Sequence, residues 1–149
     1  MDTSRFIIFL DIDGVLWQYG DNERDIDGKH IFVLPAVIAL NEIIKYYNAD
    51  LCMISGWNSD FPDAEHYKKF LISRGIFVNN LYIGEQYNRY DYVINLVKQG
   101  LTKYLIIDDE AYGFYTATNV IEYKRILCPN RYRCLDKYDV KNVTINWKL

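Results

Sequence analysis

The segment RFIIFLDIDGVLW, residues Arg5–Trp17, decides how this chain folds. Its first half, Arg5–Leu10, is a nearly continuous apolar run, which is typical of a central strand buried on both faces of a parallel sheet. The run stops at Asp11, and Asp13 and Gly14 follow at once. Because sites in open parallel sheets form at the carboxyl ends of strands, this segment predicts a buried strand that delivers two carboxylates to a site.

The rest of the chain alternates apolar runs with segments of helical periodicity. Further strands are predicted at Leu51–Ile54, Leu81–Ile83 and Tyr104–Ile107. Helices are predicted to begin at Pro35, Pro62 and Tyr90. This alternation predicts an α/β protein with a three-layer, Rossmann-like fold and a mainly parallel central sheet. Toward the C-terminus we expect strands near Val120–Tyr123 and Arg125–Cys128, followed by irregular chain.

Composition excludes several classes of protein. With 149 residues, 50% of them hydrophobic, the chain suits one domain over residues 1–149 and is too short for two. No apolar run approaches the roughly 20 residues of a membrane span, and a net charge of −3 gives no overall basic field for nucleic acid or a membrane. Three cysteines without a CxxC pair argue against a disulfide framework and a zinc site. With no readable secretory signal, we expect a cytoplasmic location.

A second pair of acids, Asp108 and Asp109, directly follows the strand predicted at Tyr104–Ile107. Together with Asp11 and Asp13 they are expected to meet at one edge of the sheet. One Asp after a strand is more often a turn former or a helix cap, but two acidic pairs after two buried strands favour a shared site. Carboxylates this close raise one another's pKa unless a cation neutralises them, and hard oxygen ligands suit Mg²⁺.

The segment FLDIDGVLW, Phe9–Trp17, resembles the first motif of the haloacid dehalogenase (HAD) superfamily, phosphatases with a DxD signature. Ser55, after the apolar run LCMI, resembles the Ser or Thr of the second motif. The pair Asp108 and Asp109 resembles the acidic pair of the fourth motif. With these elements in the right order, the resemblance extends over about residues 5–115.

The third motif of that superfamily supplies a cation, and two residues are candidates for it here. Arg89 opens a predicted helix and is the better placed, although the usual residue is Lys and Arg donates a planar fork rather than a point charge. Lys98 stands near the end of the same helix and is the alternative.

The resemblance implies a role for each matched residue. Asp11 would attack phosphorus and form an aspartyl-phosphate, and Asp13 would act as general acid and then as general base. Mg²⁺ would bind Asp11, the main-chain carbonyl of Asp13 and Asp109, with Asp108 supporting the metal site from outside. The phosphoryl group would be bound by residues of the second and third motifs, for which the candidates are Ser55, Gly56, Arg89 and Lys98.

Substrate choice in the superfamily usually depends on a cap domain inserted after the first or second motif. Neither Val15–Leu34 nor Gly56–Asn88 is long enough to hold a core of its own, so we expect a capless protein with an open site. The pattern ISGW, Ile54–Trp57, is similar to small capless members of bacteria, phages and RNA-repair proteins, although Asn58 stands where many of those carry Arg.

The expected function is hydrolysis of a phosphate monoester, with a nucleotide or the terminal phosphate of a nucleic acid as a possible substrate. Residues 123–149 carry seven Lys or Arg against two Asp, with interleaved aromatic residues, and form either a solvated face or a surface for single-stranded nucleic acid. The alternative is a catalytically weak HAD-fold protein that binds or regulates. The sequence leaves the oligomeric state open.

Overall fold

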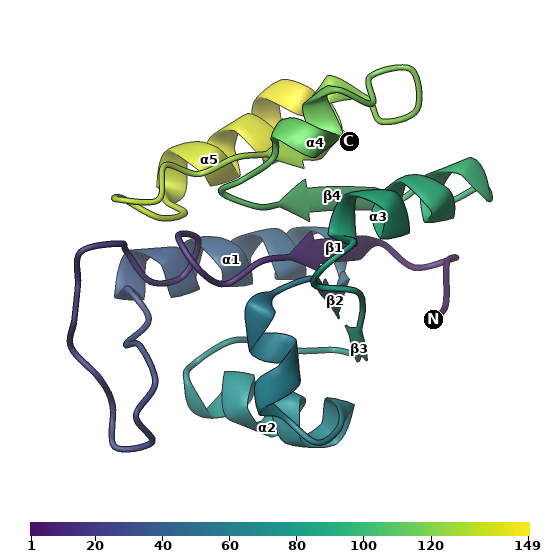
Figure 1. Cartoon of the computed structure of the whole chain (residues 1–149). Helices are drawn as coiled ribbons and strands as arrows, with labels where there is room; N and C mark the ends of the chain where they lie inside the picture. The colour runs from purple at the N-terminus through teal and green to yellow at the C-terminus, as the bar shows by residue number, and fades with distance from the viewer.

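The computed structural model describes residues 1–149 and shows a central parallel sheet with helices on both of its faces (Figure 1). The strands are β1 (Ile7–Leu10), β2 (Asp50–Met53), β3 (Leu81–Ile83), β4 (Tyr104–Ile107) and β5 (Ile126–Leu127). Their order across the sheet is β3-β2-β1-β4-β5, and every pair is parallel. The predicted three-layer, Rossmann-like α/β fold is confirmed.

The central strand β1 sets the position of everything that follows it. It pairs in register with β2 and β4, so that Leu10 lies between Met53 and Ile107. All of its residues are buried, as its apolar sequence predicts. Because the three strands end together, Asp11 and Asp108 leave the sheet at the same edge.

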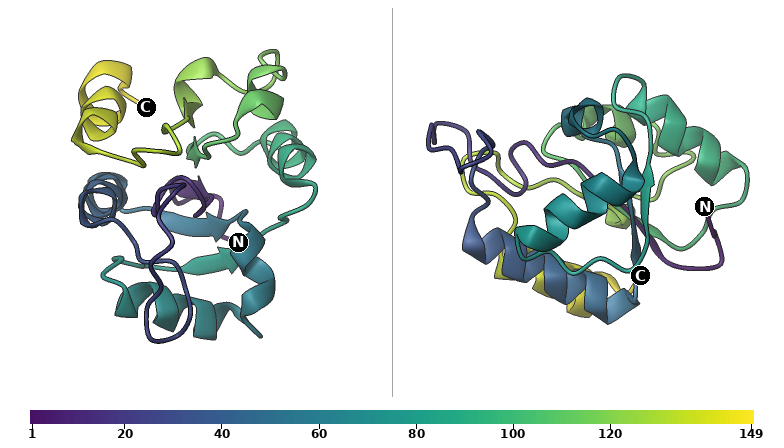
Figure 2. Two further views of the ribbon diagram at one scale, coloured as in Figure 1. Left: turned by 60° about the vertical axis from the view of Figure 1, so that its left-hand side comes forward. Right: turned by 90° about the horizontal axis from the view of Figure 1, so that it is seen from below.

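The helices form two layers, which Figure 2 shows from two further directions. The longer elements are α1 (Leu34–Tyr47), α2 (Ala64–Ser73) and α3 (Arg89–Lys98), and the shorter ones are α4 (Tyr112–Tyr115), α5 (Lys137–Lys141), the 3₁₀ turns η1 (Gly56–Asp60) and η2 (Tyr123–Arg125), and the π-helix η3 (Asn142–Trp147). One apolar cluster joins α1, α2, α5 and η3 to one face of the sheet, and a second joins α3 and α4 to the other. Alternate residues of β1 belong to alternate clusters, because successive strand side chains point to opposite faces.

The helix ends follow local sequence signals. Pro35 stands in the first turn of α1, where its missing N–H costs nothing, and Asn48 ends the helix in the left-handed conformation with φ 48°. The helix expected from Pro62 begins at Ala64, because the carboxylate of Asp63 accepts the backbone N–H of His66 and caps it.

Two expectations for the C-terminal part are wrong. Val120–Tyr123 is not a strand: the backbone N–H groups of Val120 and Ile121 bond back to the carbonyl of Ala117 at 2.9 and 2.8 Å, which closes a turn. The chain after β5 is irregular only up to residue 136, since α5 and η3 follow it. A capping box between Asp136 and Asp139 starts α5, and the element packs on α1.

No cap domain covers the sheet. The connection between β1 and α1 contains no helix and projects from the body on the left of Figure 1, with an isolated bridge between Arg24 and His30. The connection between β2 and β3 holds only η1 and α2. None of the helices is both long and apolar enough to cross a membrane.

Candidate active site

A pocket of about 270 Å³ opens at the edge where β1 and β4 end. Its lining is mostly polar and consists of Asp11, Asp13, Tyr19, Gly56, Gln86, Tyr87, Arg89, Asp109 and Glu110. A larger cavity of about 440 Å³ lies at the opposite edge, beside Arg5 and Lys103, and no carboxylate side chain lines it. We therefore take the smaller pocket, which Asp11, Asp13 and Asp109 line, as the candidate active site.

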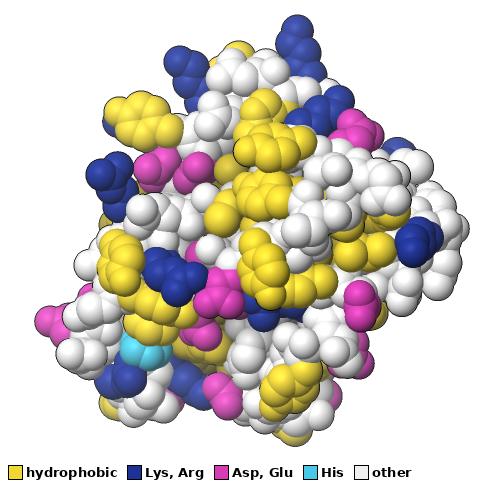
Figure 3. Space-filling view, turned by 45° about the horizontal axis from the view of Figure 1, so that its top comes forward, with side chains coloured by type: hydrophobic (Ala, Val, Ile, Leu, Met, Phe, Trp, Pro, Cys, Tyr) yellow, Lys and Arg dark blue, Asp and Glu magenta, His cyan; other side chains and the backbone are white.

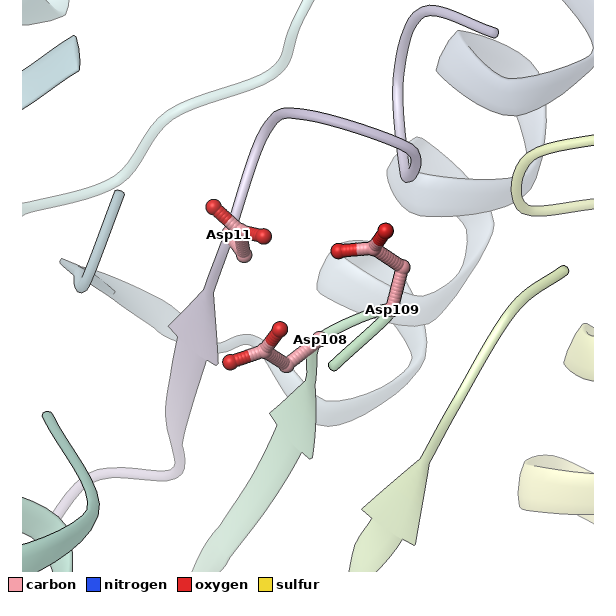
Figure 4. A group of neighbouring side chains, drawn as sticks. All are labelled: Asp11, Asp108 and Asp109. Carbon is pink, nitrogen blue, oxygen red and sulfur yellow. The ribbon is translucent and has the colours of Figure 1, made fainter. Parts of the chain in front are cut away.

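Three carboxylates meet at the base of this pocket: Asp11 and Asp109 line it, and Asp108 is fully buried beside them. Asp11 follows β1, Asp108 and Asp109 follow β4, and one oxygen of each lies within 4.8 Å of the others (Figure 4). Burial and repulsion from its two acidic neighbours hold the pKa of Asp11 well above its ordinary value. Burial raises the pKa of Asp108 to about 6 and also raises that of Asp109. We call these three residues the acidic floor.

The acidic floor fits a hard divalent cation. Oδ2 of Asp108 and Oδ2 of Asp109 are buried and accept no hydrogen bond. Arg89 Nε lies 2.7 Å from the first and Arg131 Nε 3.2 Å from the second, but neither N–H is aimed so as to form one. Buried carboxylate oxygens without donors are the ligands that Mg²⁺ and similar ions prefer.

The carboxylate of Asp13 is outside the acidic floor and has different partners. Trp17 Nε1 donates to its Oδ1 at 2.6 Å, and Trp57 Nε1 donates to the same oxygen at 2.7 Å. The resemblance assigns only the main-chain carbonyl of Asp13 to a metal, so the side chain is free for another task.

Of the two candidate cations, the structure brings only Arg89 to the pocket. Arg89 is the first residue of α3; its Nε pairs with Asp108, and its Nη2 lies 3.4 Å from Glu110. Lys98 is the last residue of the same helix, roughly 13 Å away along the axis at 1.5 Å per residue, and does not line the pocket.

The second motif places one residue at the pocket and another beneath it. Gly56 lines the pocket, whereas Ser55 is fully buried and caps η1, its Oγ accepting the backbone N–H of Trp57 at 3.1 Å. Asn58, which stands where many similar capless proteins carry Arg, is buried. Its amide N–H donates to the carbonyl of Met53 at 2.8 Å, and its amide oxygen accepts from Tyr67 Oη. Asn58 therefore holds η1 to the sheet rather than contacting a substrate.

Arg131, in the C-terminal segment, contacts three residues that line the pocket, which sequence reasoning did not foresee. Besides its pairing with Asp109, its Nη2 donates to Glu110 at 3.1 Å, and its guanidinium lies 5.0 Å above the ring of Tyr19. Its carbonyl accepts the backbone N–H of Tyr19 at 3.0 Å, and the N–H of Leu135 reaches the carbonyl of Val15 at 3.0 Å. Nothing in the spacing of the motifs points to Arg131, because the contact depends on how the chain returns after β5.

Position 14 requires glycine for two reasons: its backbone conformation and the close approach of neighbouring side chains. Its φ is +72°, which favours glycine. A Cβ there would overlap the carboxylate of Asp109 and lie 2.9 Å from Cβ of Arg131. The glycine of the first motif thus makes room for the acidic floor.

Comparison with known proteins agrees with this arrangement. Residues 7–126 match the family model described as the HAD domain in Swiss Army Knife RNA repair proteins. The chain belongs to this HAD family. Membership confirms the predicted superfamily and the predicted class of phosphohydrolase enzyme, and the matched range contains Asp11, Ser55, Arg89 and both acids after β4.

One solved structure has the same fold as this HAD domain. The cobalt-bound form of deoxy-D-mannose-octulosonate 8-phosphate phosphatase from Haemophilus influenzae aligns with a TM-score of 0.50 and 14% identity, over 98% of this chain and 90% of that one. At this identity the likeness supports the fold and no more. A search among curated proteins gives no match.

Proposed function

We propose that this HAD domain is a Mg²⁺-dependent phosphatase that hydrolyses a phosphate monoester through an aspartyl-phosphate on Asp11. The observation that carries the proposal is the convergence, in one pocket, of the acidic floor, the separately held carboxylate of Asp13 and the guanidinium of Arg89. A nucleophile, an acid and a fixed cation are the parts that phosphoryl transfer through a carboxylate requires.

The proposed metal ligands are side-chain oxygens of Asp11 and Asp109 and the main-chain carbonyl of Asp13. When bound there, Mg²⁺ supplies Lewis-acid stabilisation of negative charge on the phosphoryl oxygens. Asp108 supports the site: its Oδ1 accepts the backbone N–H of Glu110 at 2.9 Å, and its other oxygen faces Arg89. Asp108 thereby fixes the loop that presents Asp109.

In the first half of the reaction, a carboxylate oxygen of Asp11 attacks phosphorus and the bond from phosphorus to the ester oxygen breaks. Asp13, protonated at this stage, transfers its proton to the leaving oxygen, which departs as an alcohol. Arg89 provides N–H donors and positive charge for the phosphoryl oxygens, and Gly56 borders the same space.

In the second half of the reaction, a water oxygen attacks the phosphorus of the aspartyl-phosphate. The Asp13 carboxylate takes a proton from that water molecule as it attacks. The bond between phosphorus and the Asp11 oxygen breaks, which releases inorganic phosphate and restores both residues. One carboxyl group therefore serves each half-reaction in turn.

For the substrate we propose a nucleotide or the terminal phosphate of a nucleic acid. Support comes from the RNA-repair context of the family and from the open pocket, whose rim carries the aromatic rings of Tyr19 and Tyr87. On the face drawn in Figure 3, the Lys and Arg side chains are scattered rather than joined into one basic surface. We therefore expect contact with the end of a strand rather than with a long stretch of its backbone.

The proposed functional unit is a single domain over residues 1–149. We include the C-terminal segment in it, because Val140 and Val143 are part of the larger apolar cluster and Arg131 pairs with Asp109 of the acidic floor. The cytoplasm is the proposed location, since the three cysteines are free thiols, as suits a reducing compartment.

Phosphate release tests this function. Nucleotides, sugar phosphates and oligonucleotides phosphorylated at the 3′ or 5′ end are offered to the wild type and to Asp11→Asn, with Mg²⁺ or with a chelator. We expect activity that disappears with the chelator and falls by about 10⁴-fold or more in Asp11→Asn, as loss of a nucleophile does elsewhere. Full turnover by Asp11→Asn would refute the mechanism, and a clear preference for mononucleotides would exclude the nucleic-acid end.

A further inference from the structure

The two indole groups that hold Asp13 have no assigned role in the reaction. Trp17 follows β1 by a few residues and Trp57 is the second residue of η1, so they approach Asp13 from different parts of the chain. Both donate to Oδ1, at 2.6 and 2.7 Å, and no protein group is hydrogen-bonded to Oδ2. The two oxygens of this carboxylate are therefore not equivalent.

We propose that Trp17 and Trp57 are positioning residues that anchor Oδ1 of Asp13 and so reserve Oδ2 for proton exchange with the substrate and with water. An oxygen that accepts two short N–H bonds has its acceptor directions occupied, so the acid's proton resides on the other oxygen. The double anchor also stops rotation of the carboxyl group of Asp13, which lines the pocket, and so fixes the direction of Oδ2. This inference rests on the proposed function, in which Asp13 is the acid.

Each indole is itself held in place by aromatic neighbours. The ring of Trp17 is stacked between His30, with centroids 3.4 Å apart and planes 5° apart, and Tyr19, at 5.2 Å. The ring of Trp57 is buried and packs against Phe32 at 5.7 Å and Phe70 at 5.9 Å. Packing of this kind restricts the rotamer of each Trp and fixes the direction of its N–H.

The connection between β1 and α1 contacts both indoles. His30 stacks on Trp17, Phe32 packs on Trp57, and Lys29 Nζ lies 5.5 Å from the centre of the Trp57 ring while it pairs with Asp60 at 2.7 Å. At the place where related folds insert a cap, this chain has a short segment that packs on Trp17 and Trp57, the two residues that anchor Asp13.

The first test observes the hydrogen bonds directly. The chain has three Trp residues, and Trp147 packs in η3 with no hydrogen bond from its indole, so it is an internal reference. In ¹H–¹⁵N spectra of the full chain, Asp13→Ala is expected to move two of the three indole N–H signals upfield and to leave the third in place. If no signal or only one moves, the double anchor does not exist and the proposal is overturned.

The second test separates acid positioning from general packing by varying the leaving group. An alcohol must receive a proton as it departs, whereas dinitrophenolate leaves without one. In single-turnover measurements of the first half-reaction, Trp17→Phe and Trp57→Phe are each expected to slow cleavage of an alkyl phosphate by about tenfold, the loss of one hydrogen bond to a charged group. Release of dinitrophenolate should change by less than about twofold, and Trp147→Phe should change neither rate.

Asp13→Asn distinguishes failure of this inference from failure of the proposed function. If Asp13→Asn slows both substrates equally, the acid role assigned to Asp13 is wrong. If it slows only the alkyl phosphate while the Trp variants slow both substrates or neither, Asp13 is the acid and the positioning role is wrong. Should Trp57→Phe fail to fold, benzothienylalanine at that position removes the N–H, keeps the ring size and is expected to give the same selective loss.

Discussion

The two carboxylates of the first motif stand two residues apart and lie in opposite surroundings. Asp11 belongs to the acidic floor, where buried like charges raise its pKa and neighbouring oxygens lack donors. Asp13 is partly exposed and is held by two neutral N–H donors. The first carboxylate lies beside two buried acids that repel it, and the second accepts from two N–H groups that orient it.

This difference shows which part of the site needs a bound metal ion and which part needs only groups of the chain. The acidic floor brings three carboxylates together at a cost in electrostatic free energy that a divalent cation would remove. The indole pair around Asp13 needs no external group, because its donors are supplied by the chain. Changes to the floor should therefore act through the metal, and changes to the indoles should leave metal binding intact.

The largest effect that would sharpen this contrast is expected at Arg89, the cation beside the floor. Arg89→Ala removes the guanidinium that faces Asp108 and the phosphoryl group, and should lower kcat/KM by about 10²- to 10³-fold, as loss of a charge-stabilising donor does in other enzymes. Lys98→Ala, on the same helix but away from the pocket, is the matched control and should change kcat/KM by less than about twofold. Equal losses in the two variants would contradict the assignment of Arg89.

A smaller effect is expected from Gly14→Ala, which tests whether the acidic floor and the indole pair around Asp13 are independent. The added methyl would overlap Asp109, so Mg²⁺ affinity measured by calorimetry should fall by about 10- to 100-fold, while the indole signals of Trp17 and Trp57 stay in place. Gly20→Ala is the control: its φ of +95° imposes similar backbone strain, but no atom lies within 4 Å of the added Cβ. A shift of the indole signals in Gly14→Ala would show that the acidic floor and the indole pair depend on each other.

The smallest expected effect concerns stability without metal. The pKa of Asp108 is raised from 3.8 to about 6 in the folded state, so between these values the unfolded chain has lost a proton that the folded chain retains. The stability contributed by Asp108 is therefore highest below about pH 4 and decreases as the pH rises toward 6. In a chelating buffer, Asp108→Asn should be more stable than the wild type at pH 7, on the order of 1 to 3 kcal/mol, and equal to it below about pH 4.

Urea unfolding of both proteins between pH 4 and pH 8 measures this difference. Addition of Mg²⁺ should raise the stability of the wild type more than that of Asp108→Asn, which reduces the gap at pH 7. A wild type that is more stable than Asp108→Asn at pH 7 in the chelator would mean that the pairing with Arg89 outweighs burial and repulsion at this residue.

The sequence predicted the parts of the molecule that local pattern controls. The apolar run before Asp11 and the one before Asp108 fixed two adjacent parallel strands, and their common ends brought the acids together. The Asp-x-x-Asp spacing of the α5 capping box was also readable, but the segment was expected to be irregular because its helical periodicity is short.

Contacts that depend on side-chain direction were not predictable. The motifs contained Trp17 and Trp57, yet nothing in the pattern shows that both indoles reach the same oxygen. Likewise the match of Ser55 to the second motif does not show that its Oγ accepts the backbone N–H of Trp57 in η1. Arg131 was unforeseen because its pairing with Asp109 depends on the route of the chain beyond β5.

Two backbone hydrogen bonds join the C-terminal segment to the loop after β1, from Tyr19 N–H to Arg131 and from Leu135 N–H to Val15. They determine how far the chain can be truncated from its C-terminus. The family-defining range ends at residue 126, before Arg131, Leu135 and the helices that cover α1. A chain shortened to that range would keep every motif of the superfamily but would uncover an apolar helix face and release the loop that carries Tyr19. In this protein the recognisable motifs end before the folding unit does.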